Sequence, residues 1–305
     1  LMDAITGANH ATHSTDLTRI RPYSFSPDGT RLVTGQFKES KFLVIDIGNG
    51  QTVLRGELPP AAHVRCAVWK PDSSGFFIGT ESFKIYEWSI ADNSLPRQYT
   101  GHQGNIFALA IHPDGEWLLS QSEDGTTRLW NTASAQTVAQ LPYYGSEVRF
   151  SDDGRRLLCE DREAQSLHLL ELAPASVCRQ FPIPHPDQDR IGTRGCWFIA
   201  FSPDGGLLSV GDTDGIMHFD GQTGQARGRG YTGYCWSLGW TDDGSALYSV
   251  SMSGLQRWPA HPKSHPDMAG SPAGSEGASG PEAQQEWTLL SPERWPTDIP
   301  NSNRP

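Results

Sequence analysis

Short runs of alternating apolar and polar residues recur along this chain, each interrupted by a tight turn. A run ends in an aromatic or apolar residue, a Pro-Asp-Gly or Asp-Asp-Gly type of turn follows, and a second β-rich run comes after it. The copies are FSPDGTRLV (25–33), WKPDSSGFFI (69–78), IHPDGEWLL (111–119), FSDDGRRLL (150–158), FSPDGGLLS (201–209) and WTDDGSALY (240–248). Successive copies lie 44, 42, 39, 51 and 39 residues apart. This spacing predicts a repeat protein with units of about forty residues.

Each unit continues with two further short runs of β-forming residues, such as KFLVID (41–46) and TTRLWN (126–131) for the third strand. No segment shows a sustained helical period. Four short strands in about forty residues are typical of one propeller blade. We therefore expect an all-β fold, a β-propeller of four-stranded antiparallel blades, with six repeats visible and six or seven blades in the intact protein.

The domain organisation follows from the extent of the repeats. We expect the propeller to occupy residues 19–262. Residues 263–285 are rich in Gly, Ser and Pro and predict a flexible linker or loop. Residues 286–305 form a C-terminal tail that either docks as a strand or stays free. In one interpretation, the N-terminal segment 1–18 and EWTLLS (286–291) together close the last blade or complete a seventh, because the sixth copy lacks a clear fourth strand.

The third copy is the best preserved, because Gly101-His102 precedes the run FALAIHPDGEWLLSQSEDGTTRLWN (107–131). These residues resemble the WD40 family, and the resemblance extends in degenerate form over roughly residues 19–262. TolB-like propellers share the Pro-Asp-Gly turns, but the third copy favours WD40. The resemblance implies a buried hydrogen-bonded tetrad that braces one blade. Its members here would be His102, either Ser120 or Ser122, Asp124 and Trp130.

The same residues raise a competing hypothesis, a catalytic triad of Ser122, His102 and Asp124. The chain has no Gly-x-Ser-x-Gly nucleophile elbow, and the bracing network already explains all three residues. We therefore predict that the protein is not an enzyme.

Three other patterns suggest ligands but have simpler explanations. Gly228, Gly230 and Gly233 spell Gly-x-Gly-x-x-Gly, yet a strand is predicted after them where a dinucleotide site needs a helix. They are better explained as a loop between blades. The run 212–215 (DTDG) lacks the spacing of a calcium loop. Paired histidines at 10 and 13 and at 261 and 265 lack further ligands. We expect neither cofactor nor metal.

Composition excludes several partner classes. The chain is acidic, with a formal net charge of −11 over 305 residues, which disfavours nucleic acid. No apolar run is long enough to predict a membrane span. The five cysteines form no Cys-x-x-Cys pair, which favours a reducing, cytoplasmic location. The N-terminus has no secretory signal pattern, although the chain begins with Leu, so an upstream segment is compatible with it.

The function that this sequence predicts is a non-catalytic scaffold for protein–protein interaction, acting as a monomeric propeller with a protein partner. The expected binding surface is the face formed by the loops that enter each first strand, with the channel mouth. Interface energy concentrates in Tyr, Trp and Arg. The residues predicted for this surface are Arg19, His63, Asn105, Tyr143, Tyr144, Tyr231, Tyr234 and Trp236.

Two alternatives remain open at this point. Arginines on the first strands, among them Arg19, Arg21, Arg65 and Arg149, would suit an anionic small ligand or an acidic peptide at the channel. The propeller could also be the sensor or regulatory domain of a larger signalling enzyme.

Overall fold

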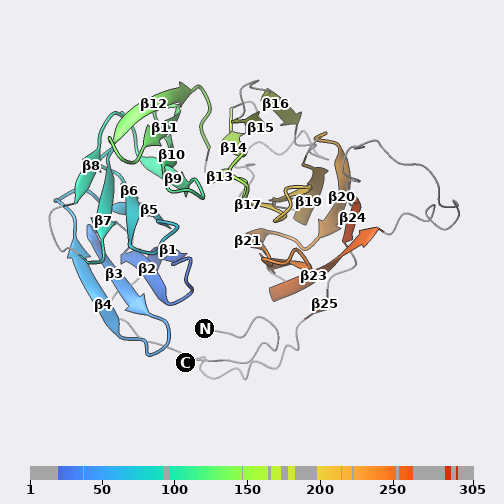
Figure 1. The fold of residues 1–305 in the computed structure, drawn as a ribbon, viewed down its shortest axis with the longest axis horizontal. Coiled ribbons are helices and arrows are strands. Elements are labelled where there is room, and N and C mark those ends of the chain that lie inside the picture. The colour runs from blue at the N-terminus through green and yellow to red at the C-terminus, as the bar shows by residue number, and fades with distance from the viewer. Residues whose placement is uncertain are drawn as a thin grey trace, which may run out of the picture. The chain divides into compact units, whose positions relative to one another are not determined.

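The computed structural model describes residues 20–36, 38–91, 96–145, 147–163, 166–172, 178–182, 198–213, 215–221, 223–251, 254–263, 286–289 and 293–294. The described secondary structure is all β, in six antiparallel sheets, which confirms the predicted fold class. The sheets are consistent with WD40 propeller blades. The chain divides into two compact units, Leu1–Cys196 with four sheets and Trp197–Pro305 with two (Figure 1).

The sheets of the first unit each contain four strands in sequence order. The first two sheets are β1 (Ile20–Phe25), β2 (Arg31–Gln36), β3 (Lys41–Asp46) and β4 (Thr52–Glu57), then β5 (Val64–Trp69), β6 (Gly75–Thr80), β7 (Ile85–Ser89) and β8 (Arg97–Tyr99). The third and fourth are β9 (Ile106–Ile111), β10 (Trp117–Ser122), β11 (Thr127–Asn131) and β12 (Gln136–Leu141), then β13 (Val148–Phe150), β14 (Arg156–Asp161), β15 (Ser166–Glu171) and β16 (Cys178–Pro182).

The second unit contains the fifth and sixth sheets. They are β17 (Phe198–Phe201), β18 (Leu207–Gly211), β19 (Gly215–Asp220) and β20 (Ala226–Tyr231), then β21 (Cys235–Trp240), β22 (Ala246–Ser251), β23 (Gly254–Lys263), β24 (Glu286–Leu289) and β25 (Glu293–Arg294). Each predicted Asp-Gly type turn connects the first strand of a sheet to the second. In these turns the Asp carboxylate caps a backbone N–H two residues later, as Asp28 does for Thr30 at 2.9 Å.

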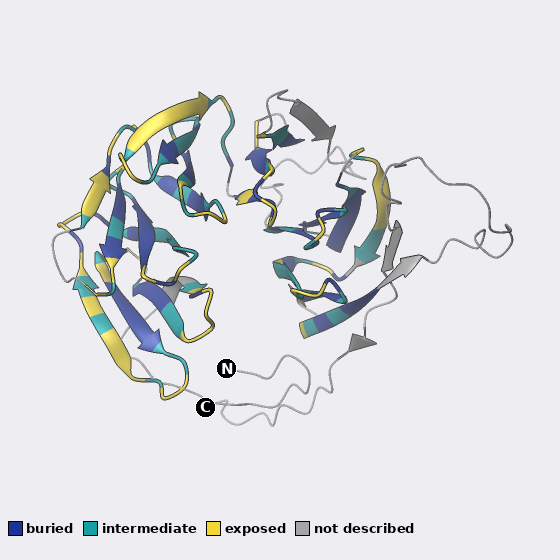
Figure 2. Cartoon of the chain, in the orientation of Figure 1, coloured by how far each residue is buried: buried dark blue, intermediate teal, exposed yellow. Residues whose placement is uncertain are grey.

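The hydrophobic core lies between successive sheets rather than within one sheet. Phe42 of β3, for example, meets Phe76 of β6 and Trp88 of β7 edge to face. Figure 2 shows the consequence for burial, since strands β6 and β10 are buried while the outer strands β4 and β12 are largely exposed. Each sheet buries its faces against the neighbouring sheets, and this packing makes the sheets rigid. The loops at the ends of the sheets are therefore anchored on a rigid framework.

The sixth sheet obtains its fourth strand from beyond the Gly/Ser/Pro-rich segment. Strand β24 pairs with β23 through Ala260↔Leu289 and the three pairs that follow. This pairing assigns residues 286–289 to the sixth sheet rather than to a seventh. Residues 1–18, the other half of the interpretation as a seventh blade, and the segment 264–285 lie outside the described residues.

Candidate functional site

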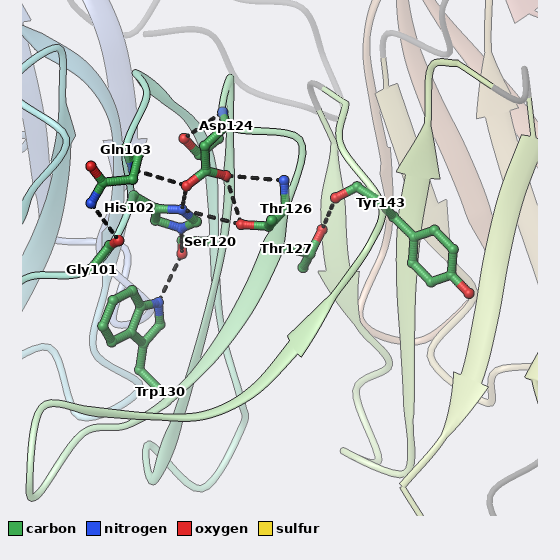
Figure 3. A network of polar contacts seen from close by, with 10 residues as sticks. Gly101, His102, Gln103, Ser120, Asp124, Thr126, Thr127, Trp130 and Tyr143 are labelled. Carbon is green, nitrogen blue, oxygen red and sulfur yellow. Dashed lines mark hydrogen bonds and ion pairs between the residues drawn. The ribbon is translucent and has the colours of Figure 1, made fainter.

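A chain of buried hydrogen bonds connects four side chains of the third sheet (Figure 3). The Nδ1 atom of His102 lies 2.8 Å from Asp124 Oδ2, and its Nε2 atom lies 2.7 Å from Ser120 Oγ. The indole N–H of Trp130 donates to the same Ser120 Oγ at 2.8 Å. The network therefore joins the loop before β9 to strands β10 and β11 and to the turn between them.

Asp124 is the most heavily bonded member of this network. Its Oδ2 accepts the backbone N–H of Gln103 at 2.9 Å, and its Oδ1 accepts the N–H and the hydroxyl of Thr126 at 3.0 and 2.6 Å. Gly104 packs so closely on this turn that a Cβ atom there would lie 2.6 Å from the backbone N of Asp124. One carboxylate thus fixes two loops at the same end of the sheet.

Ser120, and not Ser122, lies between the imidazole and the indole. Ser122 has a different role: its Oγ accepts the backbone N–H of Asp124 at 3.2 Å, within the turn between β10 and β11. The alternation of side chains along a strand places both serines on one face, so the sequence pattern alone allowed either of them. The strand pairing decides between the two serines. Leu118 of β10 pairs directly with Trp130 of β11, and Ser120 is the next residue of β10 on the same face as Leu118.

The electrostatics favour a neutral imidazole beside an ionised carboxylate. Burial lowers the pKa of His102, although Asp124 opposes this effect. Burial would by itself raise the pKa of Asp124, but the hydrogen bonds from Thr126, Gln103 and His102 outweigh it, and the pKa is lowered. A consistent proton assignment follows: Nδ1–H donates to Asp124, the Ser120 hydroxyl donates to Nε2, and the indole N–H donates to Ser120 Oγ.

The hypothetical triad serine, Ser122, bonds to the backbone of Asp124 rather than to His102. Ser120 does contact His102, but it cannot act as a nucleophile. Ser120 is 0% exposed, and its oxygen already accepts the Trp130 indole. His102 is only 3% exposed. A substrate carbonyl therefore has no route to the serine oxygen, and the geometry supports a brace within the sheet.

The other sheets keep only parts of this network. In the sixth sheet Trp258 donates to Ser249 Oγ at 2.9 Å, at the same register as Trp130 and Ser120. In the second sheet Trp88 has the register of Trp130, but Ile78 stands at the serine position. Among the described residues, the buried Trp88 indole N–H has no hydrogen-bond partner. The first and fourth sheets have Ile45 and Leu170 in place of the tryptophan.

Three of the loop residues predicted for partner binding, His63, Asn105 and Tyr144, each precede the first strand of a sheet. His63 Nδ1 lies 2.9 Å from Glu81 Oε2, and the His63 carbonyl accepts the Glu81 N–H. Asn105 likewise accepts the N–H of Glu123, and Tyr144 accepts that of Arg162, through their carbonyls. The loop that enters a first strand is therefore bonded to the turn between the second and third strands of the same sheet.

The remaining predicted aromatic residues differ in environment. The ring of Tyr143 stacks on His168 of β15, with centroids 3.8 Å apart, which makes it part of the packing between the third and fourth sheets. Trp236 is 48% exposed, and its ring centroid lies 6.4 Å from that of Tyr234. Tyr231 ends β20, where its backbone pairs with Gly215. Arg19 lies outside the described residues.

Sequence reasoning missed Phe83, at the turn between β6 and β7. The equivalent residue of the third sheet is Gly125, which also lies two residues before the third strand of its sheet and has φ of 83°. Phe83 adopts the same left-handed backbone, with φ of 64°, and is 43% exposed. An aromatic residue in this conformation is unusual. Comparing the turn lengths of the second and third copies would have aligned Phe83 with Gly125.

The sequence of the third repeat is also recognised by comparison with known proteins. The profile of the family described as "WD domain, G-beta repeat" matches residues 93–131, which include all four residues of the network. The third repeat of this chain is a WD40 repeat. This result confirms the family that the sequence resembles.

Curated relatives are WD-repeat proteins too. The chain is 37% identical over 76 residues to human serine-threonine kinase receptor-associated protein, a match that covers 25% of this chain and 22% of that protein. It is 28% identical over 166 residues to WD repeat-containing protein VIP3 of Arabidopsis thaliana, covering 50% of this chain and 52% of the relative. It is 27% identical over 159 residues to small ribosomal subunit protein RACK1y of Oryza sativa subsp. japonica, covering 50% and 46%. These matches therefore span about half or less of the relatives' length.

The remaining sequence patterns have structural roles in the WD40 repeats. Gly228 and Gly230 lie within strand β20 rather than in a loop, and only Gly233 lies in the connection, which leads into strand β21 and not a helix. A Cβ atom at Gly230 would lie 2.6 Å from the Trp258 ring, so the glycine permits close packing of neighbouring sheets. Asp212 Oδ1 accepts the N–H of Gly215 at 2.8 Å, and Oδ2 pairs with Arg229.

The described residues hold neither a cluster of metal ligands nor a helix that could span a membrane. Among those residues, no three or more His, Cys, Asp or Glu side chains come together as metal ligands would. The described part of the chain also has no helix with the length and apolar character needed to span a membrane. His261 lies on β23 with only its backbone described, and His10, His13 and His265 lie outside the described residues.

Proposed function

We propose that this WD40-repeat protein is a non-catalytic scaffold that binds a protein partner through the loops at one end of its sheets. The observation that supports this most is the bonding of those loops to each other. In the third repeat Asp124 holds the loop before β9, and in the second repeat Glu81 contacts both His63 and its backbone. Loops held in this way lose little conformational entropy when a partner binds.

The same end of the sheets presents exposed aromatic side chains. Phe83 stands on the β6–β7 turn and Trp236 near the start of β21, each more than two-fifths exposed. Aromatic residues, Phe included, are enriched in protein interfaces, and Trp is enriched at their energetic centres. Phe83 belongs to the first unit and Trp236 to the second, and each is proposed as a contact point of its own unit.

An affinity capture from a lysate tests the proposal. Three forms would be immobilised: wild type, a Phe83→Ala/Trp236→Ala variant, and a control variant Val53→Ala/Val138→Ala. The control changes two side chains that are 47% and 55% exposed on the outer strands β4 and β12. We expect the control to retain a partner that the aromatic variant loses, with unchanged melting temperatures. A partner held equally by all three forms would contradict the proposed surface.

Tyr144→Ala and Tyr234→Ala provide a second comparison in the same assay, because both residues were predicted for this surface and both are half-buried. The protein is proposed to act in a reducing, cytoplasmic compartment as a monomer. Size-exclusion chromatography with light scattering tests the oligomeric state, and fractionation of the source cells tests the location.

A further inference from the structure

The first strands of several repeats contain the same irregularity. In the second sheet Val64 pairs with Thr80 and Cys66 with Gly79, so Arg65 is an extra residue without a partner across the ladder. In the third sheet Phe107 is the extra residue between the pairs Ile106↔Ser122 and Ala108↔Gln121. In the sixth sheet Trp236 is the extra residue. All three stand four positions before the apolar residue that ends the strand.

Such a bulge turns a side chain away from the regular alternation of the strand and leaves local backbone groups unpaired. Bulges tend to occur where a strand re-aims a side chain toward a binding site. The residue types at these positions are Arg, Phe and Trp. Arg and Trp are enriched at the energetic centres of interfaces, and Phe is enriched in interfaces generally. In β1 the ladder also shifts, between Ile20 and Tyr23, and Arg21 has the equivalent place four residues before Phe25.

The bulged residues of β5 and β9 contact each other. The guanidinium carbon of Arg65 lies 5.2 Å from the centroid of the Phe107 ring, a cation–π contact between neighbouring sheets of the first unit. Stacking on an aromatic ring orients a guanidinium and leaves its in-plane N–H groups available to an acceptor. The pair therefore presents a fixed cationic group beside an apolar surface.

The polar surroundings of Arg65 leave capacity for a further acceptor. Among the described residues its ion-pair partner is Glu81, whose Oε1 lies 3.4 Å from one terminal nitrogen, longer than a good charge-assisted hydrogen bond. The other Glu81 oxygen is bonded to His63 at 2.9 Å. About a quarter of the Arg65 side chain is exposed to solvent, with 26% accessible.

From this geometry we propose that the Arg65–Phe107 pair is the subsite that takes a carboxylate side chain of a peptide segment, with an adjacent apolar side chain of the same segment lying against Phe107. The proposal deepens the proposed function, since it names the chemistry of the partner. Carboxylate recognition fits the planar donor set of arginine, and the apolar neighbour fits the ring that orients it.

The overall acidity of the chain makes this local cationic group more selective. A net charge of −11 opposes the long-range attraction of an acidic partner, so the association rate should be low. Affinity must then come from the direct contacts in the complex. The recognised segment is therefore expected to carry one or two carboxylates beside apolar residues, rather than a long acidic tract.

Selection of short random peptides displayed on phage, with the full chain immobilised, tests the proposal. The enriched sequences should share Asp or Glu next to an aliphatic or aromatic residue. The most enriched peptide is then synthesised with a fluorescent label and titrated by anisotropy. We expect Arg65→Gln to weaken its binding at least about tenfold, the scale for truncating one partner of a desolvated charge pair. Arg65→Lys should have an intermediate effect, because it keeps the charge but loses the planar donor set.

Phe107→Leu should also weaken binding, whereas Arg155→Gln should leave it unchanged. Arg155 is an exposed arginine on the turn between β13 and β14, at the opposite end of the strands, and is the matched control. Thermal melts of every variant establish that the fold is retained. Absence of enrichment, enrichment of sequences without carboxylates, or equal binding to Arg65→Gln and Arg155→Gln would overturn the proposal. Loss of the captured partner in Phe83→Ala/Trp236→Ala would still support the scaffold function in that case.

Discussion

Trp88 and Trp130 occupy the same register position in neighbouring sheets, but only Trp130 has a hydrogen-bond acceptor for its indole. The Trp130 indole N–H donates to Ser120 Oγ at 2.8 Å. In the second sheet Ile78 occupies the serine position, and the buried Trp88 N–H has no partner among the described residues. A buried donor without an acceptor costs about 1–3 kcal/mol of folding free energy. The two tryptophans should therefore respond differently to the same substitution.

We expect Trp88→Phe to change the free energy of unfolding little, because the loss of packing is offset by removal of the unsatisfied N–H. Trp130→Phe should lower it by about 1–3 kcal/mol, because it breaks a satisfied buried network. Chemical denaturation of both variants measures the difference. Equal losses in the two variants would show that the Ser120 bond contributes nothing.

Asp124→Ala should lower the free energy of unfolding by about 1–3 kcal/mol, because the N–H groups of Gln103 and Thr126 lose their acceptor. Asp242→Ala, at an exposed position of the β21–β22 turn, is the control and should change stability by less than about 0.5 kcal/mol. Differential scanning calorimetry compares the two. An unchanged melting temperature for Asp124→Ala would contradict the role of this network as a brace.

Phe83→Gly should raise stability, although it removes an aromatic side chain. The residue has a left-handed backbone with φ of 64° and is 43% exposed, so glycine removes strain and loses little buried area. The expected gain is about 0.5–1 kcal/mol after the higher entropy of the unfolded chain is counted. Urea denaturation measures it, with Phe83→Ala, which keeps the strain, expected to show no gain. A stability penalty for glycine would mean that the ring packs favourably in the free protein.

Acid should destabilise the second unit through His218. Burial lowers the pKa of this residue from 6.5 to about 4, so the folded state holds the imidazole neutral while the unfolded state takes up a proton below pH 6.5. The contribution of the neutral imidazole to stability is therefore complete above pH 6.5 and is lost as the pH falls toward 4. The loss amounts to about 3 kcal/mol.

The variant His218→Gln tests this pH dependence by denaturation at pH 7.5 and at pH 4.5. The difference in stability between the two pH values should be smaller in the variant than in wild type. An identical difference in the two proteins would show that His218 does not take up a proton on unfolding. Ser209, whose Oγ lies 3.1 Å from His218 Nδ1, is left unchanged as the local partner.

Much of the fold could be predicted because the repeat fixes it locally. Alternation of apolar residues and Asp-Gly turns specify four short antiparallel strands, and the same pattern appears six times. The third repeat also revealed its family, because His102, Asp124 and Trp130 stand in the sequence at the positions that the family pattern requires. The strand Glu286–Leu289 was harder to assign, because its partner β23 lies across more than twenty residues of Gly/Ser/Pro-rich chain.

The sequence by itself determined the strands, the turns and the family of this protein, because those depend on residues that are close together in the chain. Only the tertiary structure decided which serine meets Trp130, which tryptophan lacks an acceptor, and that Arg65 lies over Phe107. These outcomes depend on register and on contacts between sheets, and a shift of one residue reverses the face of every side chain. A bulge makes such a shift at one position. The sequence therefore singled out Arg65 as a first-strand arginine, but alternation alone could not place it beside Phe107.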